Sequence, residues 1–256
     1  MQEPVDTTLA APSIDAADVA RFEALGDEWW SERGPMRQLH KLNPVRLAFI
    51  RDHMLAHFGA PQEEGLPLAG RRMLDIGCGG GILSEPLARL GARMTSIDPG
   101  PGNVEIARLH GERHGLAIDY RATSAEALAA SGASFDAVLA MEVIEHVADV
   151  PGFIATATQL VAPGGLLFMA TLNRTLKSMA LAIVAAEYVL GWVPRGTHKW
   201  SQFVQPGELR RPLSRAGFKL VEATGVTYNP LSDRWSQNAD MDVNYMIVAR
   251  RRASAA

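Results

Sequence analysis

The sequence of 256 residues has one cysteine, Cys78, and this scarcity excludes both a disulfide framework and a zinc site built from cysteines. An excess of basic residues is also missing, because 25 Lys and Arg stand against 28 Asp and Glu for a formal net charge of −3. Proteins that bind nucleic acid in bulk carry a basic footprint. We therefore expect no nucleic-acid partner.

Long hydrophobic runs are absent as well. The longest nearly apolar stretch, residues 179–193, is interrupted by Glu187 and is shorter than the roughly 20 residues that a membrane-spanning helix needs. Residues 1–18 carry acids and lack the basic segment and apolar run of a secretory signal. We expect a cytoplasmic protein whose contact with a membrane, if any, is peripheral, at its inner face.

What is present is typical of a globular protein. Hydrophobic residues make up 47% and charged residues 21% of a chain long enough to bury a sizeable core. Composition shifts divide it into a flexible tail over residues 1–17, an N-terminal helical lid over 18–66 and a main domain over 67–256. Within the lid, Asn43 followed by Pro44 predicts the start of a helix that continues to residue 58.

Strands and helices alternate in the main domain, which is typical of a parallel sheet with crossover helices. The expected strands are residues 72–76, 93–97, 118–122, 135–141, 165–171, 218–225 and 243–250, and the expected helices are 82–90, 102–114, 125–130, 150–160 and 208–216. The pattern predicts a doubly wound, Rossmann-like α/β fold.

A glycine-rich loop follows the first expected strand in the segment Asp75-Ile76-Gly77-Cys78-Gly79-Gly80-Gly81. Glycines let the backbone pass close to a ligand, and the N-terminus of the next helix offers unpaired N–H groups. Asp98 ends the second strand, where an acid can hold ribose hydroxyls. The loop could instead be a tight turn without a ligand, and Asp98 a helix cap. Together they indicate an adenosine-containing cofactor, and the glycine spacing favours S-adenosylmethionine (SAM) over a dinucleotide.

A second polar group, Glu142, Glu145 and His146, follows the fourth strand directly. If the segment is helical, these positions share one face. Two carboxylates and an imidazole could bind one Mg²⁺ or Mn²⁺ ion. The plainer interpretation is helix capping by Glu142, with His146 as a solvated or otherwise hydrogen-bonded side chain.

The motif from Asp75 to Gly81 resembles that of the class I methyltransferases. The segment from Met141 to Val147 is similar to the ubiquinone biosynthesis O-methyltransferases, which methylate polyprenylated catechol-type precursors. Three short motifs resemble the same family: Asn43-Pro44, Gly196-Thr197-His198 and Asp242-Val243-Asn244-Tyr245. The resemblance extends from about Arg21 to Arg250.

The resemblance implies a seven-stranded class I fold that binds SAM and a polyprenylated phenol. It implies that Gly77 lies beside the methionine part, that Asp98 binds the ribose and that Arg46 reaches the cofactor. Asp75 and Gly79 are expected to bind the cofactor as well. The residues expected around the adenine are Ala125, Glu126 and Met141. Other proteins of ubiquinone biosynthesis are expected as further partners.

The chemistry suits this family, because a phenol with a pKa of about 10 must lose its proton before it attacks a sulfonium methyl group. Mg²⁺ held by Glu142, Glu145 and His146 would lower that pKa; the rival hypothesis makes His146 a metal-free general base. The functional alternatives are a class I methyltransferase on RNA or another small phenolic acceptor, a non-catalytic lipid-binding assembly protein, and an NAD oxidoreductase.

Residues 172–205 form an insertion that the plain fold does not need. Apolar residues recur in it at helical spacing and basic residues flank it. The pattern predicts an apolar helix, either a lid over the substrate pocket or an interfacial helix against anionic lipid. A polyprenyl substrate would allow both roles at once.

Overall fold

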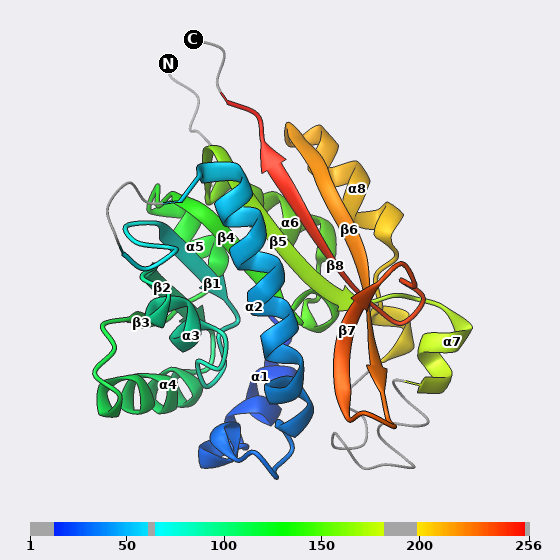
Figure 1. The fold of residues 1–256 in the computed structure, drawn as a ribbon, viewed down its shortest axis with the longest axis horizontal. Coiled ribbons are helices and arrows are strands. Elements are labelled where there is room, and N and C mark those ends of the chain that lie inside the picture. The colour runs from blue at the N-terminus through cyan, green and yellow to red at the C-terminus, as the bar shows by residue number, and fades with distance from the viewer. Residues whose placement is uncertain (1–12, 61–64, 182–198, 254–256) are drawn as a thin grey trace, which may run out of the picture.

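The alternation of strands and helices predicted from the sequence is present, and it builds one sheet with helices on both faces (Figure 1). A computed structural model describes residues 13–60, 65–181 and 199–253. The strands are β1 Arg72–Ile76, β2 Arg93–Asp98, β3 Asp119–Ala122, β4 Phe135–Met141, β5 Val161–Leu172, β6 Phe218–Asn229, β7 Arg234–Asn238 and β8 Asn244–Arg251. The helices are α1 Ala16–Glu23, α2 Arg37–Phe58, α3 Ser84–Arg89, α4 Pro101–Arg113, α5 Ala125–Ala130, α6 Val150–Gln159, α7 Leu176–Ser178 and α8 Pro206–Arg215, with 3-10 turns η1 Gly26–Trp30, η2 Ile144–His146 and η4 Trp200–Gln202.

The strands lie in the order β3-β2-β1-β4-β5-β8-β6-β7. β1 to β5 pair in parallel, and β8 is inserted antiparallel between β5 and β6. Within the described residues the sheet therefore has eight strands, and the expected seven was wrong. The additional strand is β7, an edge strand whose partner among the described strands is β6. Its side chains are mostly exposed, so it lacks the apolar alternation by which a strand is predicted from sequence.

Period-two alternation decides which face of the sheet each strand residue enters. In β5, Leu167 and Met169 pack in the core covered by α5, α6 and α8, whereas Leu166 and Phe168 pack in the core covered by α2 and α3. Both faces are apolar, which is why the central strands read as continuous hydrophobic runs.

Helix α2 belongs to this core, although its residues fall in the segment expected to be a lid. Phe49, Ile50 and Met54 are at most 2% exposed against the sheet, and burying such a side chain contributes roughly 1.5–3 kcal/mol. The helix begins at Arg37, so the start predicted at Asn43-Pro44 was wrong. Pro44 lacks the N–H that would bond four residues back; sequence signals could not show that core packing carries the helix past it.

The N-terminal segment lies across the edge where the parallel strands end. α1 and η1 lie below this edge in Figure 1. Of the expected tail, residues 1–12 lie outside the described residues, whereas Ser13 is buried and Ile14 forms a β-bridge with Val147. Among the described residues, no helix has the length and apolar character needed to cross a membrane.

Candidate functional site

A cavity of about 600 Å³ opens at the carboxyl ends of β1, β2 and β4. Ligands bind at this edge in open α/β sheets because the strand ends and helix N-termini leave a crevice there. Every residue predicted to bind the cofactor or take part in catalysis lines this cavity: Arg46, Asp75, Gly77, Gly79, Asp98, Ala125, Glu126, Met141, Glu142, Glu145 and His146. The fold thus gathers residues that are up to 100 positions apart in the chain.

The glycine loop after β1 has a structural reason for its composition. Gly77 and Gly79 have positive φ angles of 71° and 51°, which side-chain-bearing residues rarely adopt. A Cβ on Gly77 would lie 2.6 Å from Val143 Cγ2, and one on Gly79 would collide with the Trp29 indole. Trp29 therefore seals the loop from the N-terminal side. These glycines are needed for the folded chain itself, so the motif alone does not prove a ligand.

Asp98 is fixed by three hydrogen bonds at the end of β2. Its Oδ1 accepts from Gly100 N (2.8 Å) and Asn103 Nδ2 (3.1 Å), and its Oδ2 accepts from Gly79 N (3.0 Å). Burial raises the pKa of this carboxyl above its ordinary value, and the three hydrogen bonds oppose the rise. A carboxylate has about four acceptor positions, so one remains on Oδ2 for a ligand hydroxyl.

Asp75 and Arg46 form the buried floor of the cavity. Asp75 Oδ2 accepts from Ser84 Oγ at 2.6 Å, and burial raises the pKa of Asp75 to about 6. Arg46 is 2% exposed and donates from Nη2 to Asn43 Oδ1 at 2.9 Å. Its Nε has no hydrogen-bond partner within the described part of the chain. A buried guanidinium N–H in a cavity wall suits an incoming anionic group.

Glu142 has φ = +61°, one of two positive values among the described residues other than glycine. Such strain clusters at functional sites, because the surrounding structure must hold it in place. Burial, and then the nearby Glu145 charge, raises the pKa of the Glu142 carboxyl, while Arg46 and His146 oppose the rise. The segment after it is a single 3-10 turn, so the helix that would place these residues on one face does not form.

The two neighbours of Glu142 are engaged by other side chains. Glu145, 3% exposed, accepts from Thr171 Oγ1 at 2.7 Å. His146 Nδ1 lies 3.0 Å from Asp18 Oδ2 of α1. Because a carboxylate only accepts, Nδ1 carries the proton and the lone pair of the neutral ring is on Nε2. Burial lowers the pKa of His146, which favours the neutral ring.

The three predicted metal ligands are not gathered as a metal site in the described residues. The side chains that do bring three donor atoms within 4.8 Å of one another are Glu85, His110 and His114, outside this cavity. Glu142, Glu145 and His146 are close enough to influence one another's charge, and Glu145 and His146 are also held by Thr171 and Asp18.

Sequence reasoning missed the contribution of the N-terminal segment to the cavity. Ser13 donates to Glu126 Oε1 from both N (3.1 Å) and Oγ (2.7 Å), and Trp29 Nε1 donates to Asn103 Oδ1 at 3.0 Å. Asn103 in turn holds Asp98. No local pattern marks Ser13, Asp18 or Asn103, because their partners lie 74 to 128 residues away.

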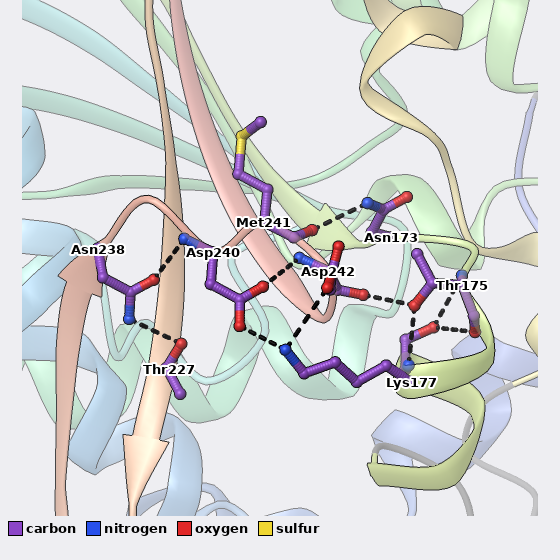
Figure 2. Close-up of polar contacts among 9 residues, drawn as sticks. Asn173, Thr175, Lys177, Thr227, Asn238, Asp240, Met241 and Asp242 are labelled. Atoms are coloured by element: carbon purple, nitrogen blue, oxygen red, sulfur yellow. Dashed lines mark hydrogen bonds and ion pairs between the residues drawn. The ribbon is translucent and has the colours of Figure 1, made fainter.

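The described ends of the insertion are held by hydrogen bonds to the motif Asp242-Val243-Asn244-Tyr245. Thr175 donates to the Asp242 carbonyl (2.6 Å), Asn173 N donates to the Val243 carbonyl (2.7 Å), and the Tyr245 hydroxyl donates to the Val204 carbonyl (2.8 Å). Figure 2 shows Lys177 reaching Asp240 and Asp242 from the start of α7. Residues 182–198, and with them most of the expected apolar helix and Gly196-Thr197-His198, lie outside the described residues.

Comparisons with known proteins agree with this geometry. Residues 41–223 match a family described as a methyltransferase domain. The chain is 57% identical over 243 residues to the ubiquinone biosynthesis O-methyltransferase of Methylobacterium sp. (strain 4-46), which covers 95% of this chain and 98% of the relative. The protein of that name from Mesorhizobium japonicum is 52% identical, over 98% of this chain and 99% of its own.

Among solved structures, the chain is similar to a magnesium protoporphyrin IX methyltransferase from Synechocystis PCC 6803 with bound SAH. The TM-score is 0.65 at 20% identity, over 93% of this chain and 100% of that one. At this identity the likeness bears on the fold alone, and it confirms the predicted class I methyltransferase fold.

Proposed function

The chain belongs to the family of ubiquinone biosynthesis O-methyltransferases and is a SAM-dependent methyltransferase, and from that premise we propose its acceptor. The enzyme transfers the methyl group to a phenolic hydroxyl of polyprenylated catechol or hydroxyphenol intermediates of ubiquinone biosynthesis. The observation that carries this proposal is that one cavity contains both the glycine loop with Asp98 and the Glu142–His146 cluster.

The residues at the cofactor end fit SAM. The remaining acceptor position on Asp98 Oδ2 suits a ribose hydroxyl, and the Arg46 Nε–H without a partner among the described residues suits the carboxylate of the methionine part. Asp75, Gly77 and Gly79 line the same cavity.

The adenine would lie against the apolar surface of Ala125 and Met141, which are 5% and 6% exposed. Glu126, held by Ser13, stands at the rim of this part of the cavity and offers a carboxylate to an exocyclic amino group. The N-terminal segment would thereby close the adenine end of the site.

At the acceptor end, the protein must remove a proton from the phenol. When bound, SAM supplies a sulfonium methyl group that a phenolate oxygen displaces in line. His146 is the base that the geometry favours, because its side chain lines the cavity and Asp18 holds its Nδ1–H, which places the lone pair of the neutral ring on Nε2. Glu142 and Glu145 stabilise the imidazolium that results, as their effect on the His146 charge indicates.

Mg²⁺ is the second candidate for this step. Glu142, Glu145 and His146 would hold it, and the ion would lower the pKa of a coordinated phenolic oxygen. Two carboxylates and an imidazole suit the ion chemically. Thr171 binds Oε2 of Glu145 and Asp18 binds Nδ1 of His146, so coordination through Glu145 Oε1 and His146 Nε2 would break neither hydrogen bond. Methyl-transfer assays after chelation therefore distinguish the Mg²⁺ mechanism from the metal-free base mechanism.

A polyprenyl tail needs an apolar exit, and apolar side chains form part of the cavity lining. Leu172, Leu181 and Val226 line the cavity. Leu231, next in sequence to the cavity-lining Pro230, is 97% exposed, and Leu176 on α7 is 75% exposed. We propose that the apolar surface formed by Leu176 and Leu231 contacts the inner, cytoplasmic face of the membrane. There the enzyme would meet its substrate and other proteins of the pathway.

The membrane proposal is tested with anionic phospholipid vesicles. We expect Leu231→Asp, in the turn between β6 and β7, to reduce co-flotation with the vesicles. Val221→Asp, exposed by 52% near the start of β6, should not. Equal flotation of both variants and the wild type would remove the membrane role of this apolar surface while leaving the soluble reaction untouched.

The test of the reaction itself is calorimetric titration with S-adenosylhomocysteine, followed by methyl transfer to a short-chain prenylated catechol with Mg²⁺ or with EDTA. We expect binding, transfer, and loss of transfer in His146→Ala. Activity that survives exhaustive chelation selects the metal-free base; activity restored only by Mg²⁺ selects the metal site.

Other outcomes select the alternatives. Binding of S-adenosylhomocysteine without transfer to any prenylated phenol, but with transfer to an unprenylated one, would move the acceptor to another small phenol. Binding of lipid without transfer to either would favour a non-catalytic assembly protein. A matched control is Glu112→Gln, an exposed acid on α4 outside the cavity, which should behave as the wild type.

A further inference from the structure

A cluster of two histidines and one glutamate lies outside the cavity, between α3 and α4. His110 lies in the last turn of α4 and His114 caps the C-terminus of that helix, and Glu85 reaches them from α3 with a side chain 3% exposed. One donor atom of each residue lies within 4.8 Å of the other two. Histidines at positions i and i+4 point to the same side of a helix and form a preorganised pair of nitrogen ligands.

The orientation of the rings is fixed by neighbours in the manner of metal-binding histidines. His114 Nδ1 lies 2.8 Å from the His110 carbonyl oxygen, which can only accept, so the lone pair of the neutral ring is on Nε2. His110 Nδ1 and Glu85 Oε1 share a hydrogen bond of 2.6 Å, which a bound cation would replace. The Trp30 indole stacks on His110 with 3.5 Å between ring centroids and 6° between planes.

We propose that Glu85, His110 and His114 bind one divalent transition-metal cation of the Zn²⁺ or Ni²⁺ class. Two imidazoles and one carboxylate are the ligands that such borderline cations prefer, whereas Mg²⁺ prefers oxygen alone. Three protein ligands leave a fourth position for water. Arg89, 3.6 Å from Glu85 Oε2, opposes the cation electrostatically and keeps the affinity moderate.

The site is connected to the cofactor loop. Trp30, which stacks on His110, donates from Nε1 to the Gly80 carbonyl at 2.9 Å. A cation that fixes His110 therefore also fixes Trp30 against the glycine loop. We expect metal binding to raise the thermal stability of the enzyme, because a ligand that binds only the folded state stabilises it.

The test uses the tag-free, metal-stripped full chain and Zn²⁺ alone, titrated against a chromophoric chelator. We expect one equivalent to bind, and His114→Ala to weaken that binding at least tenfold, on the order of the effect of ligand and second-shell changes in known sites. His114 is exposed, so this variant should fold. Glu85 is buried and forms an ion pair with Arg89, so the conservative replacement Glu85→Gln is used as the second variant.

Two controls locate the ion. Glu112→Gln lies on the same helix outside the cluster, and Glu142→Gln disables the acidic group of the cavity; both should keep wild-type Zn²⁺ affinity. The proposal is overturned if His114→Ala binds Zn²⁺ as tightly as the wild type, or if Glu142→Gln is the variant that loses the ion. S-adenosylhomocysteine binding of each variant is measured separately, so failure here leaves the methyltransferase proposal intact.

Discussion

Replacing Asp98 with asparagine changes a single oxygen at the point where the cofactor ribose is proposed to bind. The amide oxygen can keep the bonds from Gly100 N and Asn103 Nδ2, but its NH₂ group then faces Gly79 N, a second donor. The remaining acceptor position of the carboxylate is lost as well. Losing one charge-assisted hydrogen bond to a ribose hydroxyl costs roughly 1.5–3 kcal/mol. S-adenosylhomocysteine should therefore bind about 10 to 150 times more weakly.

The assay is isothermal titration of wild type, Asp98→Asn and Asp119→Asn with S-adenosylhomocysteine. Asp119 is an exposed acid on the neighbouring strand, paired with Arg121 and outside the cavity, so its variant should bind normally. Urea unfolding of Asp98→Asn should show a loss of about 1–3 kcal/mol, because the buried Gly79 N–H loses its acceptor. An affinity of folded Asp98→Asn within twofold of wild type would refute the reasoning about the ribose.

Three further predictions concern stability. Burial raises the pKa of Asp75 from 3.8 to about 6, so between about pH 4 and 6 the folded state binds more protons than the unfolded state. The free energy of unfolding should therefore fall by on the order of 3 kcal/mol as the pH rises through that window. Urea titrations of Asp75→Asn should lack this pH-dependent component. Trp29→Ala removes the indole packed on the glycine loop and should lower the free energy of unfolding by roughly 3–5 kcal/mol, measured by urea denaturation; a loss below about 1 kcal/mol would contradict the packing. Tyr245→Phe leaves the buried Val204 carbonyl without its hydroxyl donor and should cost about 1–3 kcal/mol, with faster proteolysis near the insertion; unchanged melting and proteolysis would argue against the anchor.

Much of the main domain could be predicted because its signals are local. Apolar runs such as Phe135–Met141 have to be buried on both faces, so they predict central parallel strands. The glycines at 77 and 79 mark positive φ angles, because a side chain there would be strained. β7 carried no such signal: its residues are exposed and are held by hydrogen bonds to β6 that any sequence can make.

The chemistry of the cavity was predictable as far as one strand end at a time. The order of the strands brings Asp75, Asp98 and Met141 to one edge because parallel strands share the direction of their carboxyl ends. The sequence motif after β4 did not predict the backbone conformation of Glu142. Glu142 adopts a left-handed backbone and not the first turn of a helix, and only the packed chain shows it.

The sequence by itself determined the α/β class, the cofactor loop and the family, because each depends on residue types at short, fixed spacing. The tertiary structure alone decided which partners those residues meet. Asp18 on His146, Ser13 on Glu126 and Trp29 on Asn103 join the N-terminal segment to strand ends up to 128 residues away. Contacts at that separation arise from the way the whole chain packs, and no local pattern records them.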